Sequence, residues 1–153
     1  LFAQAAEKYA AALKIKPDKH EALYNWGNAL SAQAETKIGE EADRLFAEAR
    51  EKYAAALMIK PDLHEALNNW GCALSTQAKT KAGEEADRLF AQAREKYAAA
   101  LKISPDKSEA LNNWGNTLSD QAATKSGEEA EKLHALAREK LLEAESIKGK
   151  KGL

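Results

Sequence analysis

Residues 68–75 read NNWGCALS, and this stretch decides the fold because nearly the same text occurs three times. Residues 24–31 read YNWGNALS and residues 112–119 read NNWGNTLS, so the copies lie 44 positions apart. Asparagine is a mediocre helix former and glycine a poor one, yet the surrounding segment is rich in good helix formers. We interpret the Trp–Gly pair as a packing device and the asparagines as the candidate binding residues.

The 44-residue period extends over the whole chain. Leu1, Leu45, Leu89 and Leu133 begin four copies, of which the last is incomplete. The first two copies match at 35 of 44 positions and the next pair at 32 of 44, which predicts a repeat architecture. We expect a single solenoid over residues 1–153. It would comprise an orphan helix at 1–17, repeats at 18–61, 62–105 and 106–149, and a tail at 150–153.

Each repeat predicts two helices with apolar residues at helical spacing. The first runs from about Asp62, a candidate N-cap with Glu65 three residues later, to about Thr80. The second runs from about Glu84 to Ile103. One hairpin cannot bury its own apolar stripes, whereas stacked hairpins can. The predicted fold is therefore all-α: a right-handed α-solenoid of stacked antiparallel helix hairpins, with seven helices.

Composition excludes several classes of function. Charged residues make up 31% of the chain and the net charge is −1, which argues against a nucleic-acid surface. No apolar run approaches the roughly 18 residues of a membrane span, and no signal peptide is visible. We therefore expect neither a nucleic-acid nor a membrane partner, and a cytoplasmic location.

No constellation of residues indicates catalysis or metal binding. His20 and His64 occupy equivalent places in successive repeats, so stacking would separate them. The single cysteine, Cys72, stands where the other repeats have Asn28 and Asn116, and it excludes an internal disulfide. The chain is predicted to be a non-enzyme without catalytic residues, metal or cofactor.

The repeat carries a recognisable pattern. Leu67 is followed at set intervals by the Trp70–Gly71 pair, then by Ala93, Tyr97 and Pro105. This pattern resembles the tetratricopeptide repeat (TPR), in which the period is 34 residues. Trp and Leu are exchanged here relative to the family signature. The resemblance implies that Gly71 lies where the two helices of a hairpin approach too closely for a Cβ, and that Trp70 fills the interior beside it. The ten additional residues lengthen both helices of a hairpin at the end where they are joined.

The resemblance implies a protein-interaction module that binds an extended peptide or partner segment in a concave groove formed by the first helices. Within this groove, Asn25, Asn69 and Asn113 are expected to form a ladder, since an amide offers both donors and an acceptor. The residues assigned to the groove are Glu21, Tyr24, Asn25, Asn28, Glu65, Asn68, Asn69, Cys72, Glu109, Asn112, Asn113 and Asn116.

Two alternatives stay open at this point. Each asparagine could instead cap or bridge to a neighbouring helix. The chain as a whole could be a structural scaffold or an engineered repeat array with no specific ligand. Under either reading, uncapped terminal helices predict end-to-end self-association.

Overall fold

The computed structural model describes residues 2–15 and 19–151, and within these ranges the chain forms seven α-helices and no strand. This confirms the all-α class and the number of helices predicted from the repeat. The helices are α1 (Phe2–Ile15), α2 (His20–Ala34), α3 (Gly39–Ile59), α4 (His64–Ala78), α5 (Gly83–Ile103), α6 (Ser108–Ala122) and α7 (Gly127–Lys151).

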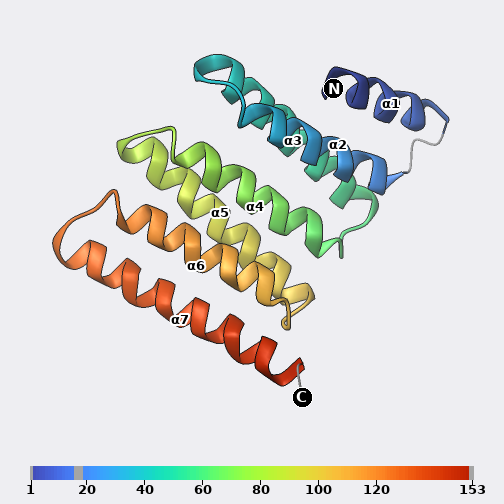
Figure 1. Cartoon of the computed structure of the whole chain (residues 1–153). Coiled ribbons are helices and arrows are strands. Elements are labelled where there is room, and N and C mark those ends of the chain that lie inside the picture. The colour runs from blue at the N-terminus through green and yellow to red at the C-terminus, as the bar shows by residue number, and fades with distance from the viewer. Residues whose placement is uncertain (1, 16–18, 152–153) are drawn as a thin grey trace.

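The helices pack as successive antiparallel hairpins. The most extensive contacts are within the pairs α2–α3, α4–α5 and α6–α7, and the next are between elements adjacent in the chain. Figure 1 shows the turns within hairpins along one edge of the stack and the connections between hairpins along the opposite edge. This nearest-neighbour arrangement is typical of a solenoid and fits a TPR-like helical repeat.

The turn between two repeats differs from the expected cap. Leu63 N donates to Lys60 O at 3.2 Å, which closes a turn with Pro61 at its second position. His64 N then donates to Asp62 O at 2.9 Å, and Leu63 has φ −77° and ψ 78°, the geometry of an inverse γ-turn. Helix α4 therefore begins at His64 with no side-chain cap, and the N-cap assignment of Asp62 is wrong.

Glycine opens the second helix of each hairpin. Gly83 has φ +58°, a left-handed conformation that residues with a Cβ rarely adopt. Gly39 and Gly127 hold the same place and conformation in the other two hairpins. Gly149, by contrast, does not end its helix: α7 continues through it to Lys151.

The hairpin core is built from glycine opposite a large ring. Gly71 is buried, and the ring of Tyr97, 1% exposed, fills the space beside it. Gly27 and Tyr53 repeat this contact, whereas Gly115 faces Leu141. The two helices of a hairpin thus approach closely at the glycine, as expected. Trp70 is half-buried: it packs against the core of two successive hairpins, while its ring lies under Lys96 Nζ at 3.8 Å.

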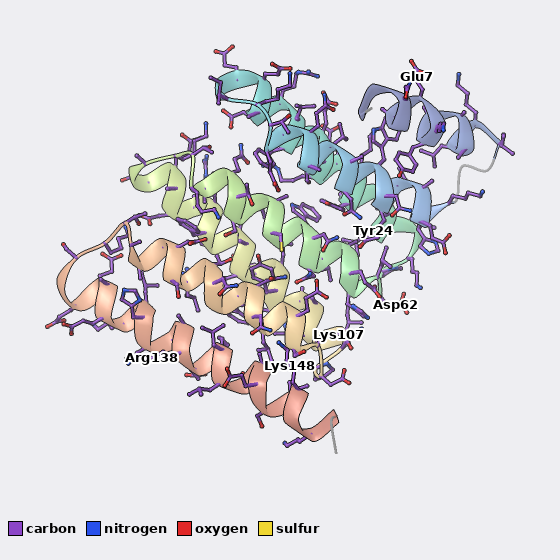
Figure 2. All side chains as sticks on the ribbon, in the orientation of Figure 1. Glu7, Tyr24, Asp62, Lys107, Arg138 and Lys148 are labelled. Atoms are coloured by element: carbon purple, nitrogen blue, oxygen red, sulfur yellow. The ribbon has the colours of Figure 1, made fainter. Side chains whose placement is uncertain are left out.

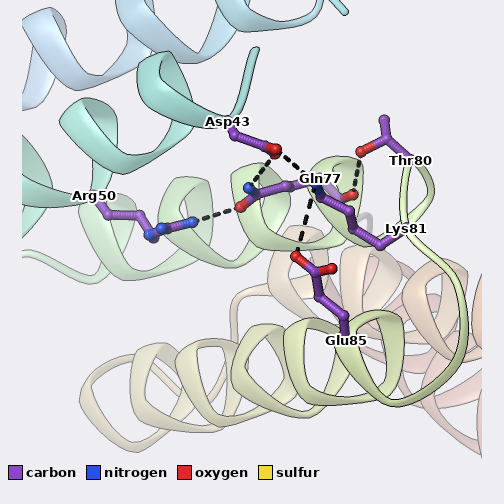
Figure 3. A network of polar contacts seen from close by, with 6 residues as sticks. All are labelled: Asp43, Arg50, Gln77, Thr80, Lys81 and Glu85. Atoms are coloured by element: carbon purple, nitrogen blue, oxygen red, sulfur yellow. Dashed lines mark hydrogen bonds and ion pairs between the residues drawn. The ribbon is translucent and has the colours of Figure 1, made fainter. Parts of the chain in front are cut away.

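A polar clamp joins one repeat to the next (Figure 3). Gln77, 6% exposed, donates to Asp43 Oδ1 at 2.8 Å and accepts from Arg50 through its side-chain oxygen. Lys81 Nζ reaches the other oxygen of Asp43 at 2.6 Å. The hydrogen bonds from Lys81 and Gln77 hold the pKa of Asp43 below its usual range. Asp87, Arg94, Gln121 and Lys125 form the same clamp one repeat later.

The last helix carries a more polar surface than its counterpart in the preceding repeat. It places Glu143 and Glu145 where α5 places Ala99 and Leu101, two residues that pack against the core between repeats. None of the helices in the described ranges combines the length and the apolar character needed to cross a membrane.

Candidate functional site

The candidate site lies on the face formed by the first helices of the hairpins, α2, α4 and α6. In α4, Asn69 and Cys72 lie about one turn apart and line hollows of this face. Trp70 is two positions from Cys72, which turns it by about 200° around the helix axis. The asparagine-bearing side and the Trp-bearing side of α4 are therefore roughly opposite.

Five of the predicted groove residues meet in one pocket of about 140 Å³, here called the junction pocket. It lies where α2, α4, the end of α5 and the start of α6 converge. Figure 2 shows two of its positions, Tyr24 and Lys107, with Asp62 between them along the edge that carries the connections between hairpins. Its lining comprises Tyr24, His64, Glu65, Asn68, Asn69, Ala100, Lys107, Glu109 and Ala110.

The asparagines of this face bond to one another across repeats. Asn69 Nδ2 donates to Tyr24 Oη at 2.9 Å and to Asn28 Oδ1 at 3.0 Å, which joins α4 to α2. Asn113 Nδ2 donates to Asn68 Oδ1 at 3.1 Å, which joins α6 to α4. Much of the hydrogen-bonding capacity of these amides is therefore used inside the protein, as the bridging alternative expected.

The same network positions a carboxylate. Asn68, 7% exposed, donates through Nδ2 to Asn69 Oδ1 at 3.2 Å and to Glu109 Oε1 at 3.4 Å. Glu109 and Glu65 are both exposed, so their charges face solvent at the mouth of the pocket. A buried amide thus orients one of two exposed carboxylates.

Two further hollows lie beside the junction pocket on the same face. The hollow between α2 and α4, of about 210 Å³, includes Asn28, Asn69 and Cys72. The hollow between α4 and α6, of about 130 Å³, includes Cys72, Asn113 and Asn116. Glu21, Asn25 and Asn112 line none of these three hollows; Glu21 and Asn25 are exposed and Asn112 is half-buried.

The hydroxyl groups of buried tyrosines form the floor of these hollows. Tyr53 Oη donates to Asn28 Oδ1 at 2.8 Å, and Tyr97 Oη lies 3.6 Å from Cys72 Sγ. Burial raises the pKa of both tyrosines and of the Cys72 thiol, so all three groups are neutral near pH 7. The substitution of Asn28 by Cys72 preserves a contact with the tyrosine of the repeat.

Several residues of this face were not predicted from the sequence. His64 and Lys107 line the junction pocket, and Tyr53 and Tyr97 support the groove from the second helices. The position of Lys107 directly after Pro105–Asp106 gave no signal, because only the stacking of α6 on α4 brings it to the pocket. Tyr97 is part of the TPR-like pattern, and that pattern did not reveal that its hydroxyl reaches the groove.

The chemistry available here is recognition through charge and hydrogen bonding. In the part of the chain that the structure describes, no group of three or more His, Cys, Asp or Glu side chains could hold a metal ion. The junction pocket offers two carboxylates, Glu65 and Glu109, against the single ammonium of Lys107. A pocket of this volume accommodates one side chain of a partner and is smaller than the roughly 300–1,000 Å³ typical of small-molecule sites.

The chain matches a known protein family. The model described as "Plant specific mitochondrial import receptor subunit TOM20" matches residues 43–151, which is most of the chain. None of the curated proteins compared with the chain matches it. The family description contradicts the predicted cytoplasmic location, because an import receptor subunit of this kind points to the mitochondrial outer membrane.

Proposed function

Because the chain belongs to the plant-specific family of TOM20 mitochondrial import receptor subunits, we propose that it binds the targeting segments of mitochondrial precursor proteins in the groove formed by α2, α4 and α6. Its partners are proteins, as the description of an import receptor implies. The family is one of receptors and not of enzymes, which suggests that the chain has no catalytic activity.

The chemistry of mitochondrial targeting segments supports this assignment. Such segments are amphipathic, rich in arginine and poor in acidic residues. A complementary site needs carboxylates for the guanidinium groups and some apolar surface for the other side of the segment. A guanidinium binds a carboxylate through parallel charge-assisted hydrogen bonds, the strongest kind available at a protein surface.

The observation that carries the proposal is the pair of carboxylates at the junction pocket. Glu65 and Glu109 come from successive repeats and lie at one pocket together with Tyr24 and two alanines. The hydrogen bond from Asn68 to Glu109 reduces the number of orientations this carboxylate must lose when it binds a cation. The pocket therefore suits one arginine of a targeting segment, with adjacent side chains placed along the neighbouring hollows.

The asparagine ladder takes a supporting role in this proposal. Asn69 and Asn113 hold the neighbouring first helices together through their side-chain nitrogens. The spacing between Glu65 and Glu109 depends on this stacking. Direct capture of a peptide backbone by these amides stays a prediction.

The test uses a synthetic arginine-rich amphipathic peptide and the double variant Glu65→Gln, Glu109→Gln. Titration of the labelled peptide by fluorescence anisotropy should show at least about a tenfold loss of affinity in the variant, the equivalent of about 1.4 kcal/mol. Glu51→Gln is the matched control, because Glu51 is an exposed glutamate on a second helix.

Two results would overturn the proposal. One is that both variants bind the peptide like the unmodified protein. The other is that a peptide in which glutamine replaces every arginine binds as tightly as the original. Circular dichroism and the urea midpoint verify that the double variant remains folded.

A further inference from the structure

A second and larger hollow lies on the opposite side of α4, between the second helices α3 and α5. Its volume is about 460 Å³, within the range of roughly 300–1,000 Å³ typical of binding pockets. We call it the back pocket. Trp70 of α4 lies in its lining, and its rim carries Arg50, Arg88, Gln92, Glu95 and Lys96.

The back pocket is basic. Arg50, Arg88 and Lys96 bring three positive charges to it, whereas Glu95 is its single lining carboxylate. Lys96 Nζ lies over the Trp70 ring, and Arg50 is half-buried with its guanidinium bonded to Gln77 (Figure 3). Two of the three cations are thus held in place by uncharged partners, and neither forms an ion pair with any residue that the structure describes. Asp43, which bonds to the same Gln77, still interacts electrostatically with Arg50 from the far side of that amide.

The third cation, Arg88, lacks the ion-pair partner that its counterpart has in the preceding repeat. In the first complete hairpin Arg44 pairs with Glu48, four residues later, at 2.6 Å. In the next hairpin Gln92 stands in the place of Glu48, so Arg88 has lost this carboxylate. Glu84 and Glu85 lie one turn before Arg88. Within the described residues, however, Arg88 forms no ion pair with either of them.

We propose that the back pocket is a docking site for an acidic segment of a partner protein, one in which carboxylates flank a large apolar side chain. The apolar side chain packs against the Trp70 ring, and the carboxylates bind Arg50, Arg88 and Lys96. Charge complementarity and the aromatic surface select this occupant over a neutral or basic segment. The geometry suits a projecting side chain, because the charges surround a hollow and not a flat surface.

The back pocket and the junction pocket have opposite charge and share no lining residue. A segment that fits one is repelled by the other. An acidic partner and a basic targeting segment can consequently be bound at the same time. The proposal of a docking site is independent of the function proposed for the groove, since the back pocket lies on a different face and is lined by different residues.

The test is binding of a fluorescent acidic peptide with one central phenylalanine, measured by anisotropy at low and at physiological salt. Arg88→Glu should weaken binding at least about tenfold. Arg44→Glu is the matched control: it makes the same charge change one repeat earlier, and it should shift the affinity less than about twofold. Gln92→Glu restores the carboxylate of the preceding repeat and should also weaken binding. All three positions are exposed, so the fold is expected to persist.

Four results would overturn the proposal. The first is equal loss of binding in the Arg88 and Arg44 variants. The second is unchanged binding when glutamines replace the acidic residues of the peptide. The third is binding of vesicles containing anionic phospholipid, dependent on Arg88, without binding of the peptide; this would assign the site to a lipid headgroup. The fourth is an equal loss of acidic-peptide binding in the Glu65→Gln, Glu109→Gln variant and in the Arg88 variant, since the two pockets share no lining residue.

Discussion

A Cβ placed on Gly71 would lie 2.6 Å from Cε1 of Tyr97, closer than side-chain atoms approach one another in folded proteins. Tyr97 is 1% exposed and its ring is packed among the buried residues of the core, so it cannot shift without disturbing them. Gly71→Ala should therefore destabilise the protein by about 1–3 kcal/mol through overpacking, despite the better helix propensity of alanine. Urea unfolding measures this cost.

Gly149→Ala is the matched control for this prediction. Gly149 also lies inside a helix, but a Cβ added there meets nothing within 4 Å. The substitution should stabilise the protein by up to about 1 kcal/mol, because only the backbone entropy of glycine is removed. If both substitutions stabilised the protein, the close packing of α4 against α5 would be wrong.

The polar clamp predicts a specific pH dependence. Lys81 and Gln77 lower the pKa of Asp43 in the folded protein, and Lys125 and Gln121 do the same for Asp87. A lowered folded-state pKa stabilises the protein above the unfolded value of about 3.9, and this contribution is lost as pH falls through the folded value. The double variant Asp43→Asn, Asp87→Asn should be less stable than the unmodified protein at pH 7.

Urea unfolding of both proteins at a series of pH values measures this contribution. The difference in stability should shrink as pH falls below about 5 and disappear in acid. If the difference stays constant from neutral pH to acid, the two side chains stabilise the fold through packing and not through their negative charge. Asp62→Asn, in an exposed turn, controls for the removal of a carboxylate as such.

The loss of stability on replacing an asparagine should depend on the hydrogen bonds that its side chain forms. Asn69 bonds to both Tyr24 and Asn28, so Asn69→Ala should cost about 1–2 kcal/mol. Asn25 is exposed and its side chain forms no hydrogen bond with any residue that the structure describes. Asn25→Ala should therefore change stability by less than about 0.5 kcal/mol. Equal costs at the two positions would contradict the inter-repeat network.

The repeat explains why so much of the fold could be predicted. A 44-residue period with two apolar stripes determined the number and order of the helices, and the Trp–Gly pair located the close approach of α4 and α5. The cap at Asp62 was wrong because the turn after Pro61 takes two more residues before α4 begins, a backbone conformation that side-chain preferences do not reveal. Trp70 was placed too deep because helical spacing cannot distinguish a fully buried ring from one under a lysine.

The site could be predicted only in part. Glu65, Asn68, Asn69 and Glu109 were assigned to one face, and they do line one pocket. The bonds between asparagines depend on how far one repeat is rotated relative to the next, which the sequence of a single repeat does not specify. The cytoplasmic assignment was wrong because it rested on the absence of recognised signals, and this absence carries no information on a receptor that works at a membrane.

The most direct measurement of the central claim is a titration of ¹⁵N-labelled protein with an arginine-rich amphipathic peptide, followed by NMR. The side-chain amides of Asn68, Asn69 and Asn113 report on the groove, and the indole N–H groups of Trp70 and Trp114 report on the opposite side of the first helices. The account predicts that the amide signals shift with the peptide concentration while the indole signals stay in place. Shifts confined to the indole signals, or no shifts at all, would contradict the assignment of the groove as the site of targeting-segment recognition.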